Sequence, residues 1–171
     1  SESQYFSPVI FFKKIIEFSN VEFDIYDEHR KMSFRNRCVV AGGGGPVNLS
    51  IPLVEGRNQR RPLVDVRIDN RRRWQDQHWK TITSCYNRSP WFEFYKSELE
   101  ILYAEPVEML ADWNRRCWDW AIKKLGVPIH TRYTESYHET VDPGQYLDWR
   151  NRLMPRSIET DFPNPVKYRQ V

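Results

Sequence analysis

Cys38 and His78 are the two residues whose types and settings point most directly to covalent chemistry. Cys38 ends the stretch "RNRC" (35–38), and neighbouring guanidinium groups lower the pKa of a thiol that they approach. His78 lies within 70–86, where a helix would place it among apolar residues. Such a histidine can act as a general base. The alternative for both is structural, because free cysteines and histidines on apolar faces are more often core residues.

Arginine recurs in clusters, and this pattern raises the question of an anionic ligand. The clusters lie at 35–37, 57–61, 70–74 and 114–116. The planar guanidinium binds phosphate and carboxylate through two parallel hydrogen bonds, so an anionic or sugar-containing small molecule is one interpretation. A solvated basic face is the other. Nucleic acid is not expected as a partner, because the net charge is only +3 and acidic residues stand among the basic clusters.

The four glycines at 42–45 could belong to a phosphate-binding loop or to a hairpin. A Walker loop needs lysine and a hydroxyl residue after its last glycine, whereas Pro46, Val47 and Asn48 follow here. A dinucleotide fingerprint needs a helix directly after the glycines, and a strand pattern follows instead. Glycine adopts positive φ without penalty, so we interpret the run as the loop of a β-hairpin.

The pattern of apolar residues predicts a mixed α and β fold in one domain. An N-terminal helix is expected within 7–19, and a largely helical second half within about 70–125, where 105–126 has the clearest helical period. Four central strands are expected at about 21–27, 37–41, 47–53 and 63–69. This order of elements does not fit a doubly wound repeat of βαβ units. The sequence beyond Gly126 has no regular pattern.

The cysteines and the lengths of the apolar runs indicate where the protein is located and whether it binds zinc. The three cysteines (Cys38, Cys85 and Cys117) form no CxxC pair, which favours a reducing, cytoplasmic location and gives no zinc signature. No apolar run approaches the roughly 20 residues that a membrane-spanning helix needs. We expect no metal and no cofactor, and the sequence does not indicate an oligomeric state.

Several stretches, taken in order, resemble the WbqC-like protein family. They are "QYFSPVIFFKKI", "SFRNRCVV", "LSIPL", "VRIDNRRRWQDQHWKTITSCYNRSPWF" and the ending "YRQV". The resemblance covers about Gln4 to Leu125 and is most specific from Ile68 to Phe92. That block carries Asp69, Asn70, Trp74, His78, Ile82, Tyr86 and Pro90 where the family pattern has them.

The chain departs from the family pattern at three places. Many relatives begin with a His-x-P-x-Y motif, whereas this chain has "SESQYF". Many also have a second asparagine where Cys38 stands, which weakens the case for an obligatory cysteine nucleophile. In relatives a further segment follows the counterpart of "YRQV", so we expect this single domain to lack a C-terminal piece that they carry.

The resemblance implies a bacterial protein of O-antigen or surface-polysaccharide biosynthesis, and a transferase that attaches an acyl or aminoacyl group such as glycine to a sugar. The site would combine catalytic His78 and Cys38 with substrate-binding Gln4, Tyr5, Arg35, Asn36, Arg37, Asn70 and Trp74. Arg35 or Arg37 would hold a phosphate or carboxylate, His78 would act as base, and Trp74 would stack on the sugar. The donor would arrive activated, as a thioester. A non-catalytic interaction module or nucleic-acid binder is the alternative.

Overall fold

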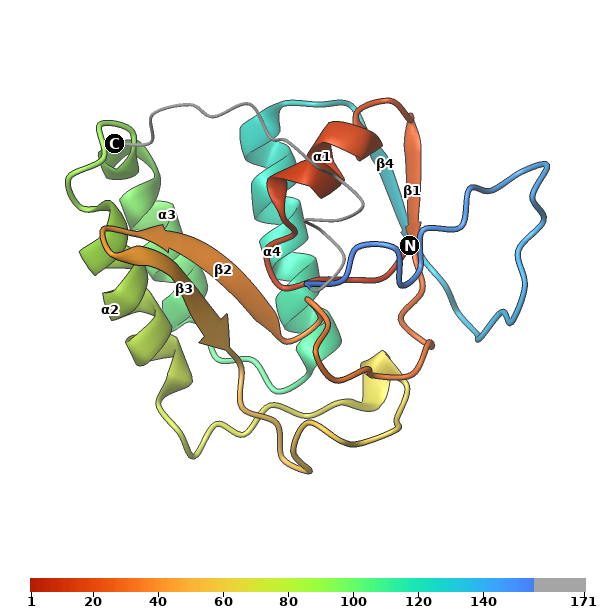
Figure 1. Cartoon of the computed structure of the whole chain (residues 1–171), viewed down its shortest axis with the longest axis horizontal. Helices are drawn as coiled ribbons and strands as arrows, with labels where there is room; N and C mark the ends of the chain where they lie inside the picture. The colour runs from red at the N-terminus through yellow and green to blue at the C-terminus, as the bar shows by residue number, and fades with distance from the viewer. Residues whose placement is uncertain (156–171) are drawn as a thin grey trace.

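The longest helix, α4 (Leu110–Leu125), lies between two apolar cores in the computed structural model, which describes residues 1–155. It is followed by Gly126, whose φ of 64° is a left-handed conformation that glycine adopts freely. Trp113 and Cys117 on one side of α4 belong to the larger core, and Trp118 on the other side belongs to the smaller core. Figure 1 shows α4 at the centre, with the other elements on either side.

The larger core forms where a hairpin packs beside two helices. The helices are α2 (Trp74–Tyr86) and α3 (Phe92–Ala104), and the hairpin pairs β2 (Arg37–Gly42) with β3 (Gly45–Ser50). Gly42 pairs with Gly45, so the predicted glycine hairpin is confirmed. Tyr86 ties the hairpin to α2, because its hydroxyl accepts a hydrogen bond from the Ala41 N–H at 2.9 Å.

The smaller core lies on the opposite side of α4. It is formed by α1 (Val9–Ile15) and by a sheet in which β1 (Asn20–Phe23) runs parallel to β4 (His130–Tyr133). The Trp118 ring contacts Phe23, with centroids 4.9 Å apart, and its indole N–H donates to Thr131 Oγ1 at 2.9 Å. In Figure 1 this sheet stands at the opposite side of the molecule from the hairpin.

The mixed α and β fold is confirmed, but several element boundaries differ from the prediction. The predicted strand at 63–69 is wrong: Leu63–Asp65 (η1) is a 3₁₀ turn, followed by single bridges at Arg67 and Ile68. The buried residues Leu63 and Val66 recur with a period of three, and such a turn places both in the core. The segment predicted as strand 21–27 is regular only as far as Phe23, and β4 was not predicted.

Two further differences concern the helices and the end of the chain. Helix α2 begins at Trp74 and not near Asn70, because Asp69 Oδ1 accepts the Arg71 N–H and holds the chain in a turn. The stretch "YRQV", which resembles the family near its C-terminus, lies outside the described residues.

Candidate functional site

Tyr5 is the centre of a buried polar cluster that joins residues distant in the sequence. Its side chain has no exposed surface. The hydroxyl lies 3.0 Å from Nδ1 of His78 and 2.5 Å from the hydroxyl of Tyr103. The predicted residues Tyr5 and His78 are therefore in contact, whereas sequence reasoning missed Tyr103. Tyr103 faces the core from α3, at a position in the regular helical pattern that carries no sign of a polar role.

His78 is held as a neutral imidazole inside this cluster. Burial lowers the pKa of His78 to about 4, and a hydrogen bond to the Ser50 carbonyl opposes that shift. At neutral pH the ring donates to the Ser50 carbonyl and accepts the Tyr5 hydroxyl proton at Nδ1. The Tyr103 hydroxyl then donates to the Tyr5 oxygen, so both ring nitrogens and both hydroxyls have partners.

Trp74 and Asn70 connect the cluster to the surface at the start of α2. The indole N–H of Trp74 donates to Asn70 Oδ1 at 3.0 Å, and the Asn70 amide donates to the Val107 carbonyl at 2.7 Å. The Trp74 ring is buried between His78 and Trp113, so the ring face predicted to stack on a sugar is covered in this conformation. Asn70 itself is exposed.

Cys38 is a buried thiol that adjoins Tyr5. Burial raises the pKa of Cys38 to about 12, although a hydrogen bond with Tyr5 acts in the opposite direction. Burial also raises the pKa of Cys117 well above the ordinary value of a thiol. Because the thiolate is the nucleophile, Cys38 is unreactive at neutral pH in this conformation. Its predicted catalytic role stays a prediction that requires the cluster to open.

The thiols give a direct test of this burial. We expect the native protein at pH 8 to react with one equivalent of a disulfide reagent such as DTNB, at half-buried Cys85, because Cys38 and Cys117 are buried. All three should react in denaturant. A Cys85→Ser variant is the control and should show almost no fast reaction. Fast reaction of Cys38 in that variant would contradict the buried, protonated thiol.

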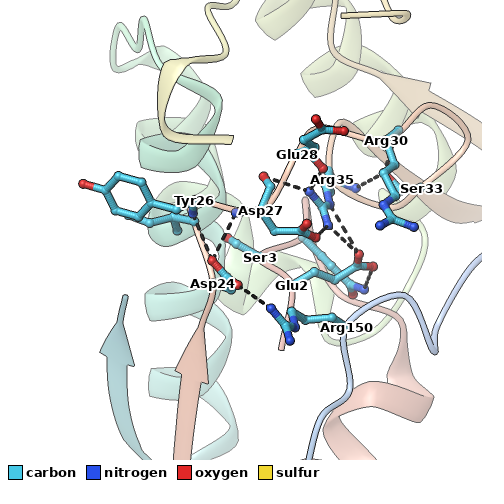
Figure 2. Close-up of polar contacts among 12 residues, drawn as sticks. Glu2, Ser3, Asp24, Tyr26, Asp27, Glu28, Arg30, Ser33, Arg35 and Arg150 are labelled. Carbon is cyan, nitrogen blue, oxygen red and sulfur yellow. Dashed lines mark hydrogen bonds and ion pairs between the residues drawn. The ribbon is translucent and has the colours of Figure 1, made fainter. Parts of the chain in front are cut away.

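Arg35 is the centre of a second buried cluster, shown in Figure 2. Its guanidinium has no exposed surface and forms ion pairs with Glu2, at 3.3 Å, and with Asp27. It also donates to the Asp27 and Glu28 carbonyls. The donors of Arg35 are thus directed at groups of the protein and not at a ligand. Sequence reasoning missed Glu2 and Asp27, whose roles depend on this long-range contact.

The segment Glu2–Tyr5 joins the two clusters. The Gln4 amide donates to Glu2 Oε1 at 2.9 Å, while Tyr5 reaches His78. The buried Asn114 donates to the carbonyls of Ser3 and Arg35, at 3.2 and 2.9 Å, and so fixes both of these segments to α4. Asn114 was also missed, although it lies three residues before Cys117 on the apolar face of a clearly amphipathic helix.

The remaining two predicted residues lie at the margins. Asn36 is buried and donates to the Ile51 carbonyl at 3.1 Å, next to the larger core. Half-buried Arg37 belongs to neither cluster, because its side chain turns to Met32 Sδ at 3.3 Å.

A cavity of about 880 Å³ lies elsewhere in the described chain. It is bounded by α1, β1 and residues 132–150, and none of the predicted site residues lines it. Within residues 1–155 no group of three His, Cys, Asp or Glu side chains could hold a metal ion, and no helix is long and apolar enough to cross a membrane.

These features define a class: a mixed α and β domain whose N-terminal segment is fixed inside the protein by two polar clusters. The chain belongs to the WbqC-like protein family, whose sequence model matches residues 3–157. No curated protein and no solved structure matches the chain.

Proposed function

We propose that this WbqC-like protein is a transferase that attaches an acyl or aminoacyl group, such as glycine, to an amino sugar in bacterial surface-polysaccharide biosynthesis. The observation that carries the proposal is the gathering of predicted site residues: all but Arg37 belong to, or adjoin, the two clusters that meet at Glu2–Tyr5. Membership of the family supports it. The cytoplasmic location that the cysteine usage predicts is part of the same proposal.

The start of α2 is where the proposed substrate approaches this cluster. Asn70 and Arg72 are exposed there, and His78 lies one turn further along the helix with 6% of its surface exposed. Arg72 has no ion pair in the described part of the chain, so its guanidinium is free for a sugar phosphate. His78 accepts a proton only after its hydrogen bond with Tyr5 breaks, so movement of Glu2–Tyr5 is part of the mechanism.

The reaction proposed is aminolysis of a thioester. The sugar amine attacks the acyl carbonyl carbon, a C–N bond forms, and the C–S bond breaks. His78 takes the proton from the attacking nitrogen and returns it to the departing thiolate, so no further reactant is needed. With the resting pKa of about 4, His78 would be a weak base, and opening of the cluster to water would raise that pKa towards its ordinary value.

A transfer assay with matched histidine variants tests this proposal. Purified protein is incubated with an amino-sugar nucleotide and acyl or glycyl thioesters, and the amide product is measured by mass spectrometry. We expect His78→Gln to lower the rate at least 100-fold. The control is His130→Gln, at an exposed position of β4, and its transfer rate should equal that of wild type.

Two outcomes would count against the proposal. Wild-type rates in a folded His78→Gln variant would remove His78 from the mechanism. Absence of product with every donor, from protein with a cooperative unfolding transition, would refute the transferase.

A non-catalytic interaction protein is the second candidate, and one surface favours it. The side chains of Trp91, Phe94 and Ile101 are exposed by 68%, 69% and 60% at and along α3. Large apolar side chains grouped in this way are typical of interfaces. If they form one, a Trp91→Ser/Phe94→Ser variant should keep its thermal stability and lose association in size-exclusion chromatography with light scattering.

Nucleic acid is not proposed as a partner. Four of the seven arginines in 57–73 are paired with acidic groups, which leaves three guanidiniums of this segment for phosphates. These ion pairs are Arg61–Glu55, Arg67–Glu108, Arg71–Asp69 and Arg73–Asp76.

A further inference from the structure

Two buried carboxylates share the single positive charge of Arg35. The guanidinium lies between Glu2 and Asp27, and none of the three side chains is more than 7% exposed. The nearby cations do not balance the second carboxylate: Arg150, seen beside Glu2 in Figure 2, is bound to other acidic side chains, and the Ser1 nitrogen donates to a backbone carbonyl. A buried charge without compensation is unfavourable, so one carboxylate of this cluster exceeds what Arg35 can neutralise.

Glu2 matches the guanidinium of Arg35 imperfectly. Its Oε2 atom accepts from both Nε and Nη2 of Arg35, each at 3.3 Å, whereas charge-assisted bonds of this kind are typically about 2.7–2.9 Å long. Its other oxygen, Oε1, accepts the Gln4 amide at 2.9 Å instead. Because both donors converge on one oxygen, the planar fork of Arg35 lacks its two parallel bonds. A carboxylate or phosphate that offers two oxygens would fit this fork better than Glu2 does.

Arg35 has enough other contacts to keep its position without Glu2. Its Nη1 atom donates to the carbonyls of Asp27 and Glu28, and its Nη2 atom also donates to the Asp27 carboxylate. Its own carbonyl accepts from Asn114 of α4 at 2.9 Å. Departure of Glu2 would therefore leave Nε and one N–H of Nη2 available on a fixed guanidinium.

The segment Glu2–Tyr5 leaves buried polar atoms unsatisfied in this arrangement. Gln4 Oε1 and Asn114 Oδ1 are buried, and neither has a hydrogen-bond partner in the described chain. Such atoms raise the free energy of the conformation that contains them. Gln4 also joins the two clusters, because its amide donates to Glu2 while the next residue, Tyr5, bonds to His78. Release of Glu2 therefore loosens the segment that places Tyr5 on His78.

We propose that Glu2 occupies the place of an anionic group of the substrate, a carboxylate or a phosphate, which displaces Glu2 from Arg35 and thereby frees His78 from Tyr5. Two oxygens of the ligand accept from Nε and Nη2 of Arg35. Because Arg35 is buried, the ligand binds only molecules in which the segment has moved, and its affinity depends on their fraction. This inference rests on the proposed function, whose mechanism includes movement of Glu2–Tyr5, and it names the substrate group that causes that movement.

An NMR titration of the isotope-labelled full chain tests whether Arg35 binds such a group. The charged probes are N-acetylglucosamine 1-phosphate and glucuronic acid, and uncharged N-acetylglucosamine is the control. We expect a charged probe to shift the Nε–H signal of Arg35 at millimolar concentration, and the control to leave it unchanged. A response to only one of the charged probes identifies the anion as phosphate or carboxylate.

Two matched substitutions distinguish displacement of Glu2 from a general effect of charge. Glu2→Gln and Asp27→Asn each remove one carboxylate from Arg35. Glu2→Gln weakens the bond that holds the segment, so the Kd of the charged probe should fall at least about fivefold. Asp27→Asn leaves Glu2 as the counter-ion of Arg35, so its Kd should equal or exceed that of wild type. A general electrostatic effect would lower the Kd in both variants.

The reactivity of Cys38 reports whether the segment moves. Cys38 adjoins Tyr5, to which it is hydrogen-bonded, so displacement of Tyr5 exposes the thiol. In a Cys85→Ser variant, a saturating charged probe should speed the reaction of Cys38 with DTNB at least about fivefold, and the uncharged sugar should not. If Glu2→Gln fails to fold, this measurement still tests the proposal, because it leaves Glu2 in place.

Three results would overturn the proposal. One is an unchanged Arg35 signal with both charged probes, and another is an equal fall of the Kd in Glu2→Gln and Asp27→Asn. The third is binding of a probe that leaves the reactivity of Cys38 unchanged. None of these measurements involves group transfer, so protein that fails them but forms product in the transfer assay would refute the displacement alone. Protein that passes them but forms no product would refute the transferase alone.

Discussion

Replacing Arg35 with alanine should cost about 3–5 kcal/mol of the free energy of unfolding, since removal of one partner leaves buried charges without compensation. Arg35 has no exposed surface, and its guanidinium lies between the carboxylates of Glu2 and Asp27. In the variant these two buried carboxylates would face each other, and the Asp27 and Glu28 carbonyls would lose their donor. Urea denaturation followed by circular dichroism measures the loss.

Two further arginine variants serve as controls for the Arg35→Ala measurement. Arg67→Ala removes an ion pair whose side chains are 64% and 77% exposed, so we expect a change below about 1 kcal/mol. Arg35→Lys keeps the charge but lacks the planar fork, and it should fall between wild type and Arg35→Ala. If Arg35→Ala were no less stable than Arg67→Ala, the cluster shown in Figure 2 would not stabilise the fold.

Acid should unfold the protein through two buried histidines. Burial lowers the pKa of His78 to about 4 and, together with the charge of Arg35, lowers that of His29 to about 4. In the unfolded chain these two histidines bind protons near pH 6.5, whereas in the folded chain they bind them only near pH 4. Stability is therefore complete above pH 6.5 and is lost as the pH falls to 4, by about 3 kcal/mol for each histidine.

His29 offers the cleaner test of this pH dependence, because neither of its ring nitrogens has a hydrogen-bond partner in the described chain. A His29→Leu variant should therefore be as stable as wild type at pH 7.5. Between pH 6.5 and 4 its free energy of unfolding should fall by only about half as much as that of wild type. Urea midpoints at pH 7.5, 5.5 and 4.5 measure the effect, and exposed His130→Gln is the control. Equal pH dependence in His29→Leu and wild type would contradict the assignment.

Some residues of the candidate site were named from the sequence, but their arrangement was not predictable. Tyr5 and His78 were both identified, yet their contact joins positions 73 residues apart. The partners Tyr103, Glu2 and Asp27 were missed because an ordinary tyrosine or carboxylate gains its role only when a distant chain segment lies beside it. Likewise, "RNRC" suggested an activated thiol, whereas Arg35 is committed to its carboxylates and Cys38 is buried.

The sequence by itself determined the elements whose signals are local. The period of 3.6 residues and the following glycine predicted α4, which begins at Leu110 and not near residue 105, and the glycine run predicted the turn between β2 and β3. Only the tertiary structure decided that segment 63–69 begins with a 3₁₀ turn and that β4 pairs with β1. It also decided that His78 and Cys38 are uncharged at neutral pH. Periodicity and turn geometry depend on neighbours along the chain, whereas strand pairing and desolvation depend on which distant segments meet.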